Sequence, residues 1–334
     1  MTEAQIIKLA SRPKGMPDAQ TFRTETHTVA APGEGELLVK GLYYSVDPYM
    51  RGRMNDAKSY IAPFQVDAPI NGGAVAEVLE SNAAGFAKGD LVTGMLPWAT
   101  EATVPAQGLK KIDPSGVPPH YFLGILGMPG LTAYFGLLDI CNPQPGETVV
   151  VSGAAGAVGI VVGQIAKIKG CRVVGIAGSD EKTAMLKNEF GFDEAINYNT
   201  VTDMKQAIAD ACPDGVDVYF DNVGGDISDA VILNINFHAR IALCGQIALY
   251  NTGEMPVGPR LQPMLLTRSA LMKGFTIGNY QPRFAEGMQA LVQWVKEGKL
   301  TYTETIVHGF DQLPQAFLGL FSGQNKGKMI VAAE

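Results

Sequence analysis

Short apolar runs recur along the whole chain, but what separates them changes about a third of the way along. In the first 120 residues the runs are alternating or β-rich, as at 36–40, 73–79 and 90–94, and Gly, Pro, Asn and Asp cluster between them. A period of two and frequent turn residues are typical of β-strands joined by tight turns. The pattern predicts an antiparallel, barrel-like β domain with few long helices.

From about residue 125 onward, the apolar runs alternate with helical patterns. Helices are expected at 157–169 and 180–190, the second with Ser179 or Asp180 as its N-cap. The strands expected in this region are 147–151, 172–177, 194–197, 216–221 and 240–244. Repeated strand–helix–strand units predict a parallel, doubly wound sheet with helices on both faces.

The sheet domain is expected to end with one more strand and a helix, and the tail from residue 300 to 334 returns to β-rich sequence. The elements expected in these two parts are a last sheet strand at 275–277, a helix across 284–295, a strand at 301–307, a short helix near 314–320 and a strand at 328–332. We therefore expect an α/β protein in which residues 123–298 form the parallel-sheet domain. This domain is inserted into a β domain made of residues 1–122 and completed by 299–334.

Composition and charge narrow the function classes. Of the 334 residues, 46% are hydrophobic and 18% charged, which is typical of a globular chain with a sizeable core. Lys and Arg number 26 against 33 Asp and Glu, a net charge of −7. An acidic chain is poorly suited to bind nucleic acid or an anionic membrane.

Three local features bear on location and on metals. The first 15 residues contain Glu3 and lack the basic start and apolar core of a secretory signal, so a cytoplasmic location is expected. The four cysteines form no CxxC pair, which fits neither a disulfide framework nor a structural zinc site. The uncharged segment 148–166 is interrupted by Ser152, Gln164 and several glycines, so it reads as strand, turn and helix rather than a membrane span.

A glycine-rich turn within that segment points to a dinucleotide. Gly156 would let the backbone approach a pyrophosphate, Gly159 would let the helix pack closely on the strand, and the helix N-terminus would stabilise the anion. Ala154 stands where the usual GxGxxG motif has its first glycine. A glycine-rich turn without a ligand has the same spacing, but the surrounding strand–helix–strand unit favours cofactor binding.

The segment after the second strand of that unit bears on the choice between NADP and NAD. Gly178 and Ser179 remove bulk there and Lys182 adds a charge that could pair with a 2′-phosphate, which favours NADP. Asp180 could instead accept bonds from the ribose hydroxyls, as the acid of an NAD site does, or only cap a helix.

Seven segments spread along the chain resemble one known family. They are Ser45-Val-Asp-Pro-Tyr-Met-Arg51, the stretch 127–138, Ala154-Ala-Gly-Ala-Val-Gly159, the stretch 177–182, Tyr219-Phe-Asp-Asn-Val-Gly-Gly225, Cys244-Gly245 with Tyr250-Asn251, and Asn325-Lys-Gly-Lys328. In these segments the chain resembles the zinc-free medium-chain dehydrogenase/reductase superfamily. Within it, the match is to the prostaglandin reductase or leukotriene B4 12-hydroxydehydrogenase family, with its curcumin reductases and alkenal double-bond reductases. The resemblance implies a GroES-like β-barrel catalytic domain, a Rossmann domain, NADPH as cofactor and a homodimer that pairs Rossmann sheets near Phe275.

The resemblance also assigns residues to the cofactor. The phosphate turn would consist of Gly156, Ala157, Val158 and Gly159; the adenosine phosphate end would meet Lys182 and Tyr198; Asn222 would enter the cofactor groove; Cys244, Gly245, Tyr250, Phe275, Thr276 and Ile277 would line the nicotinamide side; and Asn325 would close on the cofactor. The loop before Tyr250 departs from the family, because Ala248-Leu249 stands where many members have Ser-Gln.

The chemistry expected of such a site uses no metal. The Gly-His-Glu segment of zinc alcohol dehydrogenases is absent, since the comparable stretch 71–75 reads Asn-Gly-Gly-Ala-Val, and the four histidines lack ligand spacing. Hydrogen-bond donors must then polarise an enone carbonyl as enolate charge grows. Tyr250 is the first candidate and Tyr49 the second, although Tyr49 could equally be a packed tyrosine at a turn. The cofactor's ribose hydroxyl could also be the donor, and water could supply the α-carbon proton. Arg51 and Arg53 could approach the cofactor phosphates, but we interpret them as solvated surface residues.

Together these observations predict an NADPH-dependent, zinc-independent reductase of activated C=C bonds in α,β-unsaturated ketones or aldehydes. Hydride would reach the β-carbon, and the resulting enolate would be protonated. A quinone reductase and a non-catalytic NADPH-binding protein remain the alternatives.

Overall fold

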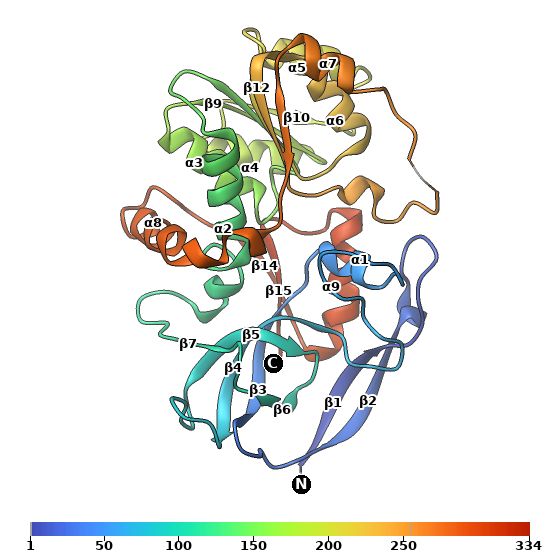
Figure 1. The fold of residues 1–334 in the computed structure, drawn as a ribbon, viewed down its shortest axis with the longest axis vertical. Helices are drawn as coiled ribbons and strands as arrows, with labels where there is room; N and C mark the ends of the chain where they lie inside the picture. The colour runs from blue at the N-terminus through green and yellow to red at the C-terminus, as the bar shows by residue number, and fades with distance from the viewer. Residues whose placement is uncertain (1, 255) are drawn as a thin grey trace. The chain divides into compact units, whose positions relative to one another are not determined.

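Two compact units make up the computed structural model, which describes residues 2–254 and 256–334 (Figure 1). Unit 1 consists of Met1–Gly124, Glu304–Asn325 and Met329–Glu334. Unit 2 consists of Ile125–Thr303 and Lys326–Lys328.

Unit 1 is built on antiparallel sheet. Its strands are β1 (Thr2–Leu9), β2 (Phe22–Val29), β3 (Glu36–Ser45), β4 (Asn71–Ser81), β5 (Leu91–Pro97), β6 (Glu101–Pro105), β7 (Lys110–Ile112) and β14 (Glu304–His308), with β15 (Lys328–Ala332) at the end of the chain. β1 pairs with β2, and a seven-stranded sheet has the order β14-β15-β3-β4-β5-β7, with β6 also on β3. The runs predicted at 36–40, 73–79 and 90–94 lie in or overlap β3, β4 and β5, so the prediction of antiparallel β structure is confirmed.

Aromatic side chains fill the core of unit 1. Trp98 is fully buried and stacks on Phe22, with ring centroids 6.3 Å apart, and Phe22 meets the edge of Phe317 at 6.1 Å. Phe317 belongs to α9 (Leu313–Gly319), the short helix expected near the chain end. A second short helix, α1 (Tyr49–Arg53), was not expected from the pattern.

Unit 2 contains a parallel six-stranded sheet with the order β10-β9-β8-β11-β12-β13. Its strands are β8 (Thr148–Ser152), β9 (Arg172–Ala177), β10 (Glu194–Asn197), β11 (Val216–Asp221), β12 (Ile235–Leu243) and β13 (Leu271–Gly274). Its helices are α2 (Met128–Phe135), the π-helix Gly136–Cys141, α3 (Gly159–Ile168), α4 (Asp180–Phe190), α5 (Met204–Ala211), α6 (Gly225–Ile232), α7 (Gln262–Thr267) and α8 (Phe284–Lys296). This strand order is the doubly wound dinucleotide-binding arrangement.

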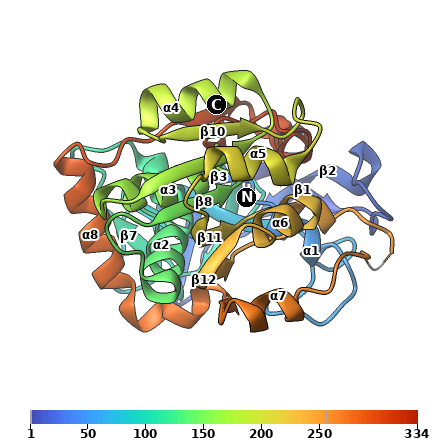
Figure 2. The ribbon, with the colours of Figure 1, turned by 90° about the horizontal axis from the view of Figure 1, so that it is seen from above.

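Helices cover both faces of this sheet, as the repeated units predict (Figure 2). α5, α6 and α7 pack on one face through an apolar cluster that includes Ile208, Val231 and Ile241. α2, α3 and α4 lie on the other side, with α3 against β8 and β9. Every residue of β8 is buried, which explains why that run is apolar without alternation.

Local signals located several boundaries accurately. The strands 172–177, 194–197 and 216–221 and the helix 180–190 are present as predicted. Ser179, not Asp180, caps α4, because its Oγ accepts from the Lys182 amide at 3.2 Å. α3 begins at Gly159, two residues later than expected, since the turn continues through Val158.

The strand predicted at 275–277 is wrong. The sheet strand β13 ends at Gly274, and Thr276 instead begins a 3-10 turn over Ile277–Arg283 through a capping box with Asn279. Phe275 follows the end of the strand, and its side chain packs against Phe220, with ring centroids 6.3 Å apart. Apolar composition alone does not distinguish a residue that belongs to a strand from one that packs from a turn.

No helix among the described residues is long and apolar enough to cross a membrane. The uncharged segment 148–166 is a strand, a glycine turn and a helix, as the sequence indicated.

Candidate active site

The predicted cofactor residues of unit 2 follow the carboxyl ends of its strands. β8, β9, β10, β11 and β12 end at Ser152, Ala177, Asn197, Asp221 and Leu243. The phosphate turn, Lys182, Tyr198, Asn222 and the 244–250 loop come after these ends in that order. Carboxyl ends of parallel strands share one edge of a sheet, which is where doubly wound folds bind ligands.

The glycine turn fits a phosphate group. A Cβ built on Gly156 would meet only the Gly153 carbonyl oxygen, at 3.2 Å, so its other sides are open. A Cβ on Gly159 would lie 2.4 Å from that same oxygen and 2.7 Å from the Ala154 Cα, so the helix packs directly on the turn. No side chain caps the N-terminus of α3 at Val158. An uncapped helix N-terminus beside an open backbone can receive an anion.

The chain's tail runs along this turn. Gly327 forms a parallel bridge with Gly156, and its amide donates to the Ala155 carbonyl at 2.8 Å. Gly327 has φ +63°, and a Cβ there would lie 1.9 Å from the Thr303 carbonyl oxygen. Only glycine fits this close approach. Asn325, predicted to close on the cofactor, is half-buried and belongs to unit 1, two residues before Gly327.

The predicted adenosine end has Tyr198 beside the turn after β9. A Cβ on Gly178 would lie 2.5 Å from the Tyr198 hydroxyl, so the small residue lets the tyrosine approach. Asp180 is exposed, and its carboxylate accepts a hydrogen bond from the side-chain nitrogen Nδ2 of Asn197 at 2.7 Å. Lys182 lies in the first turn of α4, and burial, followed by the nearby positive charge of Lys326, lowers its pKa.

A buried carboxylate missing from the predicted set organises the next strand end. Asp221 Oδ1 accepts from the Ser152 hydroxyl at 3.0 Å, the Tyr219 hydroxyl at 2.8 Å and the amides of Val223 and Gly224 at 3.0 and 2.9 Å. Its Oδ2 accepts from Gln246 Nε2 at 3.1 Å. The sequence signal was an acid ending an otherwise apolar strand, since a buried charge needs such partners.

Asn222 is held rigidly beside that carboxylate. Its amide donates to Ser152 Oγ at 3.0 Å, and its side-chain nitrogen donates to the Ser152 carbonyl at 2.8 Å. The side chain thus ties the end of β11 to the end of β8.

Tyr250 folds back onto its own loop. Its hydroxyl oxygen accepts from the Gln246 amide at 3.2 Å, which leaves the O–H hydrogen to donate elsewhere. Burial raises the pKa of Tyr250, so the hydroxyl stays protonated at neutral pH. The Ala248 amide donates to the Val223 carbonyl at 3.0 Å, so this part of the loop holds to its own domain through backbone contacts.

The other predicted nicotinamide residues have mixed roles. Burial raises the pKa of the Cys244 thiol to about 12. Gly245 lies close to Asn222 and Tyr250, since a Cβ there would be 3.1 Å from the Asn222 carbonyl oxygen. Phe275, Thr276 and Ile277 follow the carboxyl end of β13, but Phe275 is half-buried against the Phe220 ring and Thr276 caps a turn.

In unit 1, the prediction for the two arginines is wrong, because both are buried. Arg51 donates to the Gly15 carbonyl at 2.8 Å and to Asn55 Oδ1 at 2.7 Å. Arg53 donates to Asn71 Oδ1 at 2.8 Å and lies 3.9 Å above the Phe64 ring. Tyr49, beside them at the start of α1, is half-buried, and burial followed by the charge of Asp47 raises its pKa.

Within residues 2–254 and 256–334, no three His, Cys, Asp or Glu side chains converge on a position that could hold a metal ion. His120 instead faces Glu304 in unit 1, with Nδ1 2.5 Å from Oε2.

Comparison with known proteins agrees with the geometry. Residues 5–112 match the family model described as the N-terminal domain of oxidoreductase, and residues 157–295 match the one described as zinc-binding dehydrogenase. YfmJ of Bacillus subtilis (strain 168) is 58% identical over 329 residues, which cover 98% of this chain and 97% of that protein. The NADP(+)-dependent 2-alkenal reductase of Nicotiana tabacum is 47% identical, covering 90% and 88% of the two chains. The crystal structure of CurA from Vibrio vulnificus in complex with NADPH has 45% identity and a TM-score of 0.94, covering 99% of each chain.

The antiparallel domain and the doubly wound sheet therefore define a medium-chain dehydrogenase/reductase, as predicted. Within that superfamily the chain belongs to the prostaglandin reductase family, with its curcumin and 2-alkenal reductases.

Proposed function

We propose that this protein is an NADPH-dependent reductase of activated C=C bonds in α,β-unsaturated ketones and aldehydes. The observation that carries the proposal is the open glycine turn at Gly156, which follows the carboxyl end of β8 in the parallel sheet. It occurs in a chain that is 47% identical to a reductase named for 2-alkenals and NADP(+), and 45% identical to a protein solved with NADPH.

In this proposal, Gly156, Ala157, Val158 and Gly159 hold the pyrophosphate through backbone amides and the N-terminus of α3. Lys182 and Tyr198 meet the adenosine phosphate end, Asn222 borders the groove, and Asn325 closes over the cofactor. The carboxyl-end loops at Cys244, Gly245, Tyr250, Phe275, Thr276 and Ile277 border the nicotinamide. When bound, NADPH supplies the hydride that reaches the substrate's β-carbon.

Tyr250 is the residue proposed to polarise the substrate carbonyl. Its O–H donates to the oxygen that becomes negative in the enolate, while the Gln246 amide donates to the tyrosine oxygen from behind. Protonation of the α-carbon by water completes the reduction. Tyr49 is the second candidate donor, and burial keeps its hydroxyl protonated as well.

The test is NADPH oxidation by purified protein with 3-nonen-2-one, with NADH in parallel and the product identified by mass. A saturated ketone is expected. Tight NADPH binding without turnover of this enone would contradict the proposal; reduction of quinones to hydroquinones would then indicate a quinone reductase, and no turnover of either would indicate a binding protein.

A homodimer and a cytoplasmic location are part of the same proposal. β13 lies at the edge of the sheet, with Leu271, Lys273 and Gly274 exposed, and such an edge invites pairing with a second copy. Light scattering should give twice the chain mass, and Leu271→Asp should give the monomer. The four cysteines are free thiols, which fits a reducing compartment, and cell fractionation tests the location.

A further inference from the structure

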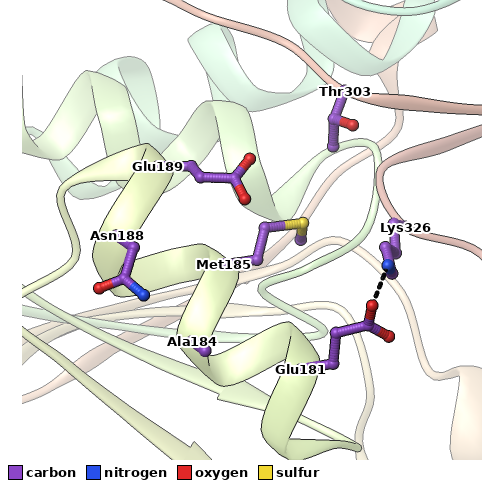
Figure 3. Close-up of a pocket in the computed structure, with 7 residues that line it drawn as sticks. All are labelled: Glu181, Ala184, Met185, Asn188, Glu189, Thr303 and Lys326. Atoms are coloured by element: carbon purple, nitrogen blue, oxygen red, sulfur yellow. Dashed lines mark hydrogen bonds and ion pairs between the residues drawn. The ribbon is translucent and has the colours of Figure 1, made fainter.

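Lys326, in the tail of the chain, places a positive charge near the residues predicted to meet the adenosine end of the cofactor. Lys326 Nζ forms an ion pair with the Glu181 carboxylate, which comes from a residue 145 positions earlier, in the first turn of α4. Figure 3 shows the two side chains pointing toward each other beside a pocket of about 370 Å³.

The backbone holds Lys326 in this position. The next residue, Gly327, is bridged to Gly156 and bonded to the Ala155 carbonyl, and no larger residue fits at Gly327. The lysine therefore starts from a fixed point on the phosphate turn, while its side chain remains 42% exposed and can reorient.

A second lysine lies next to Glu181 in the sequence. Lys182 directly follows Glu181 in the first turn of α4, and the charge of Glu181 raises the pKa of Lys182 whereas the charge of Lys326 lowers it. The ion pair with Glu181 thus brings Lys326 to the residue that precedes Lys182, at the start of the helix that follows β9.

We propose that Lys326 is a second cation for the 2′-phosphate of NADPH, beside Lys182, and that Glu181 competes with the phosphate for it. Lys326 then helps to determine the preference for NADPH over NADH. This inference rests on the proposed placement of the adenosine end at Lys182 and Tyr198.

Charge explains why the lysine would change partner. A phosphate monoester carries about −1.5 to −2 charge and three acceptor oxygens, more than one carboxylate offers. Glu181 is 70% exposed, so leaving Lys326 strands no buried charge. The same carboxylate repels the phosphate, so its removal should strengthen NADPH binding.

The experiment measures dissociation constants for NADPH and NADH by nicotinamide fluorescence, at low and high salt. Lys326→Met should weaken NADPH binding by roughly threefold to fivefold, near the most that an exposed ion pair contributes, and leave NADH unchanged. Glu181→Gln should tighten NADPH binding about twofold to threefold at low salt, also without effect on NADH, and added salt should reduce both differences. Lys187→Met is the matched control for the loss of an exposed lysine that forms an ion pair. Lys187 lies on α4, as Glu181 does, and pairs with Glu194 at 2.9 Å.

Two results would overturn the inference. Equal weakening of NADPH and NADH in Lys326→Met would show that the residue only fastens the tail, and unchanged NADPH binding in this variant would show that it does not reach the phosphate. Lys182→Met separates the two proposals: if it removes the NADPH preference while Lys326→Met does not, only the inference on Lys326 fails. If neither variant changes the preference, the placement of the adenosine end is wrong as well.

Discussion

Replacing Gly156 by alanine tests the phosphate turn directly. The new Cβ would meet a single protein atom, the Gly153 carbonyl oxygen at 3.2 Å, which requires a shift of only a few tenths of an ångström. Its φ is not in the left-handed region, and alanine also restricts the unfolded chain. We therefore expect Gly156→Ala to fold, with a Tm within about 3 °C of the wild type.

Gly156→Ala should weaken cofactor binding while leaving the stability of the fold nearly unchanged. The methyl group occupies the open side of the turn, where the pyrophosphate must approach the backbone. Loss of one hydrogen bond to a charged group costs about 1.5–3 kcal/mol of binding free energy, which corresponds to a dissociation constant that is roughly 10- to 150-fold larger. Because NADPH and NADH share the pyrophosphate, both should weaken by the same factor.

Gly159→Ala is the matched control three residues further on. Its Cβ would lie 2.4 Å from the Gly153 carbonyl oxygen and 2.8 Å from that of Ala154, and backbone atoms cannot rotate away. Overpacking of this kind destabilises by about 1–3 kcal/mol, so Tm should fall by roughly 2–12 °C, at about 2–4 °C per kcal/mol.

Thermal melts and fluorescence titrations of both variants decide the matter. Wild-type affinity for both cofactors in a folded Gly156→Ala protein would refute the placement of the pyrophosphate. A loss of Tm as large as in Gly159→Ala would show that Gly156 is required for packing instead.

Three further predictions concern protonation. Tyr250→Phe should lower kcat by about 10- to 100-fold and leave the affinity for NADPH unchanged. Because burial raises the pKa of Tyr250, its hydroxyl should add no ionisation to the pH–rate profile of the wild type between pH 6 and 9. A kcat equal to that of the wild type would assign the donor role to another group. Burial would raise the pKa of Glu147, but the hydrogen bonds from Arg240 and the Gln144 amide, together with the charge of Arg240, outweigh it and lower that pKa. Glu147→Gln should therefore lose about 1–2 kcal/mol of unfolding free energy at pH 7, and the difference should shrink below about pH 4. A constant difference in pH-dependent melts would argue against the ion pair. Because burial raises the pKa of each cysteine thiol, the native protein should react with iodoacetamide at pH 8 far more slowly than the unfolded chain, as mass spectrometry can show. Fast labelling of Cys244, which is half-buried, would contradict the raised pKa of its thiol.

Sequence alone predicts the elements whose signals are local. The helix 180–190 has its cap at Ser179 and an αL residue at Gly191, and the strands beside it are short apolar runs between turns. The glycine turn was likewise recognisable, because its spacing reflects contacts within the turn, such as the close approach of Gly159 to the Gly153 carbonyl oxygen.

Features that depend on distant partners escaped prediction. Arg51 looks like a surface residue until Gly15, 36 positions away, accepts its hydrogen bond. The role of Asp221 arises only when Ser152 and Gln246 are brought beside it. The pairing of Lys326 with Glu181 spans 145 positions, and no local pattern records it.

The central claim is that hydride passes from NADPH to the β-carbon of an enone. It is tested most directly with NADPH that carries deuterium at both C4 positions of the nicotinamide and with 3-nonen-2-one as substrate. We predict a saturated ketone with one deuterium, located at the β-carbon by NMR. Deuterium at the carbinol carbon of an allylic alcohol, or a reduced product without deuterium, would contradict the account.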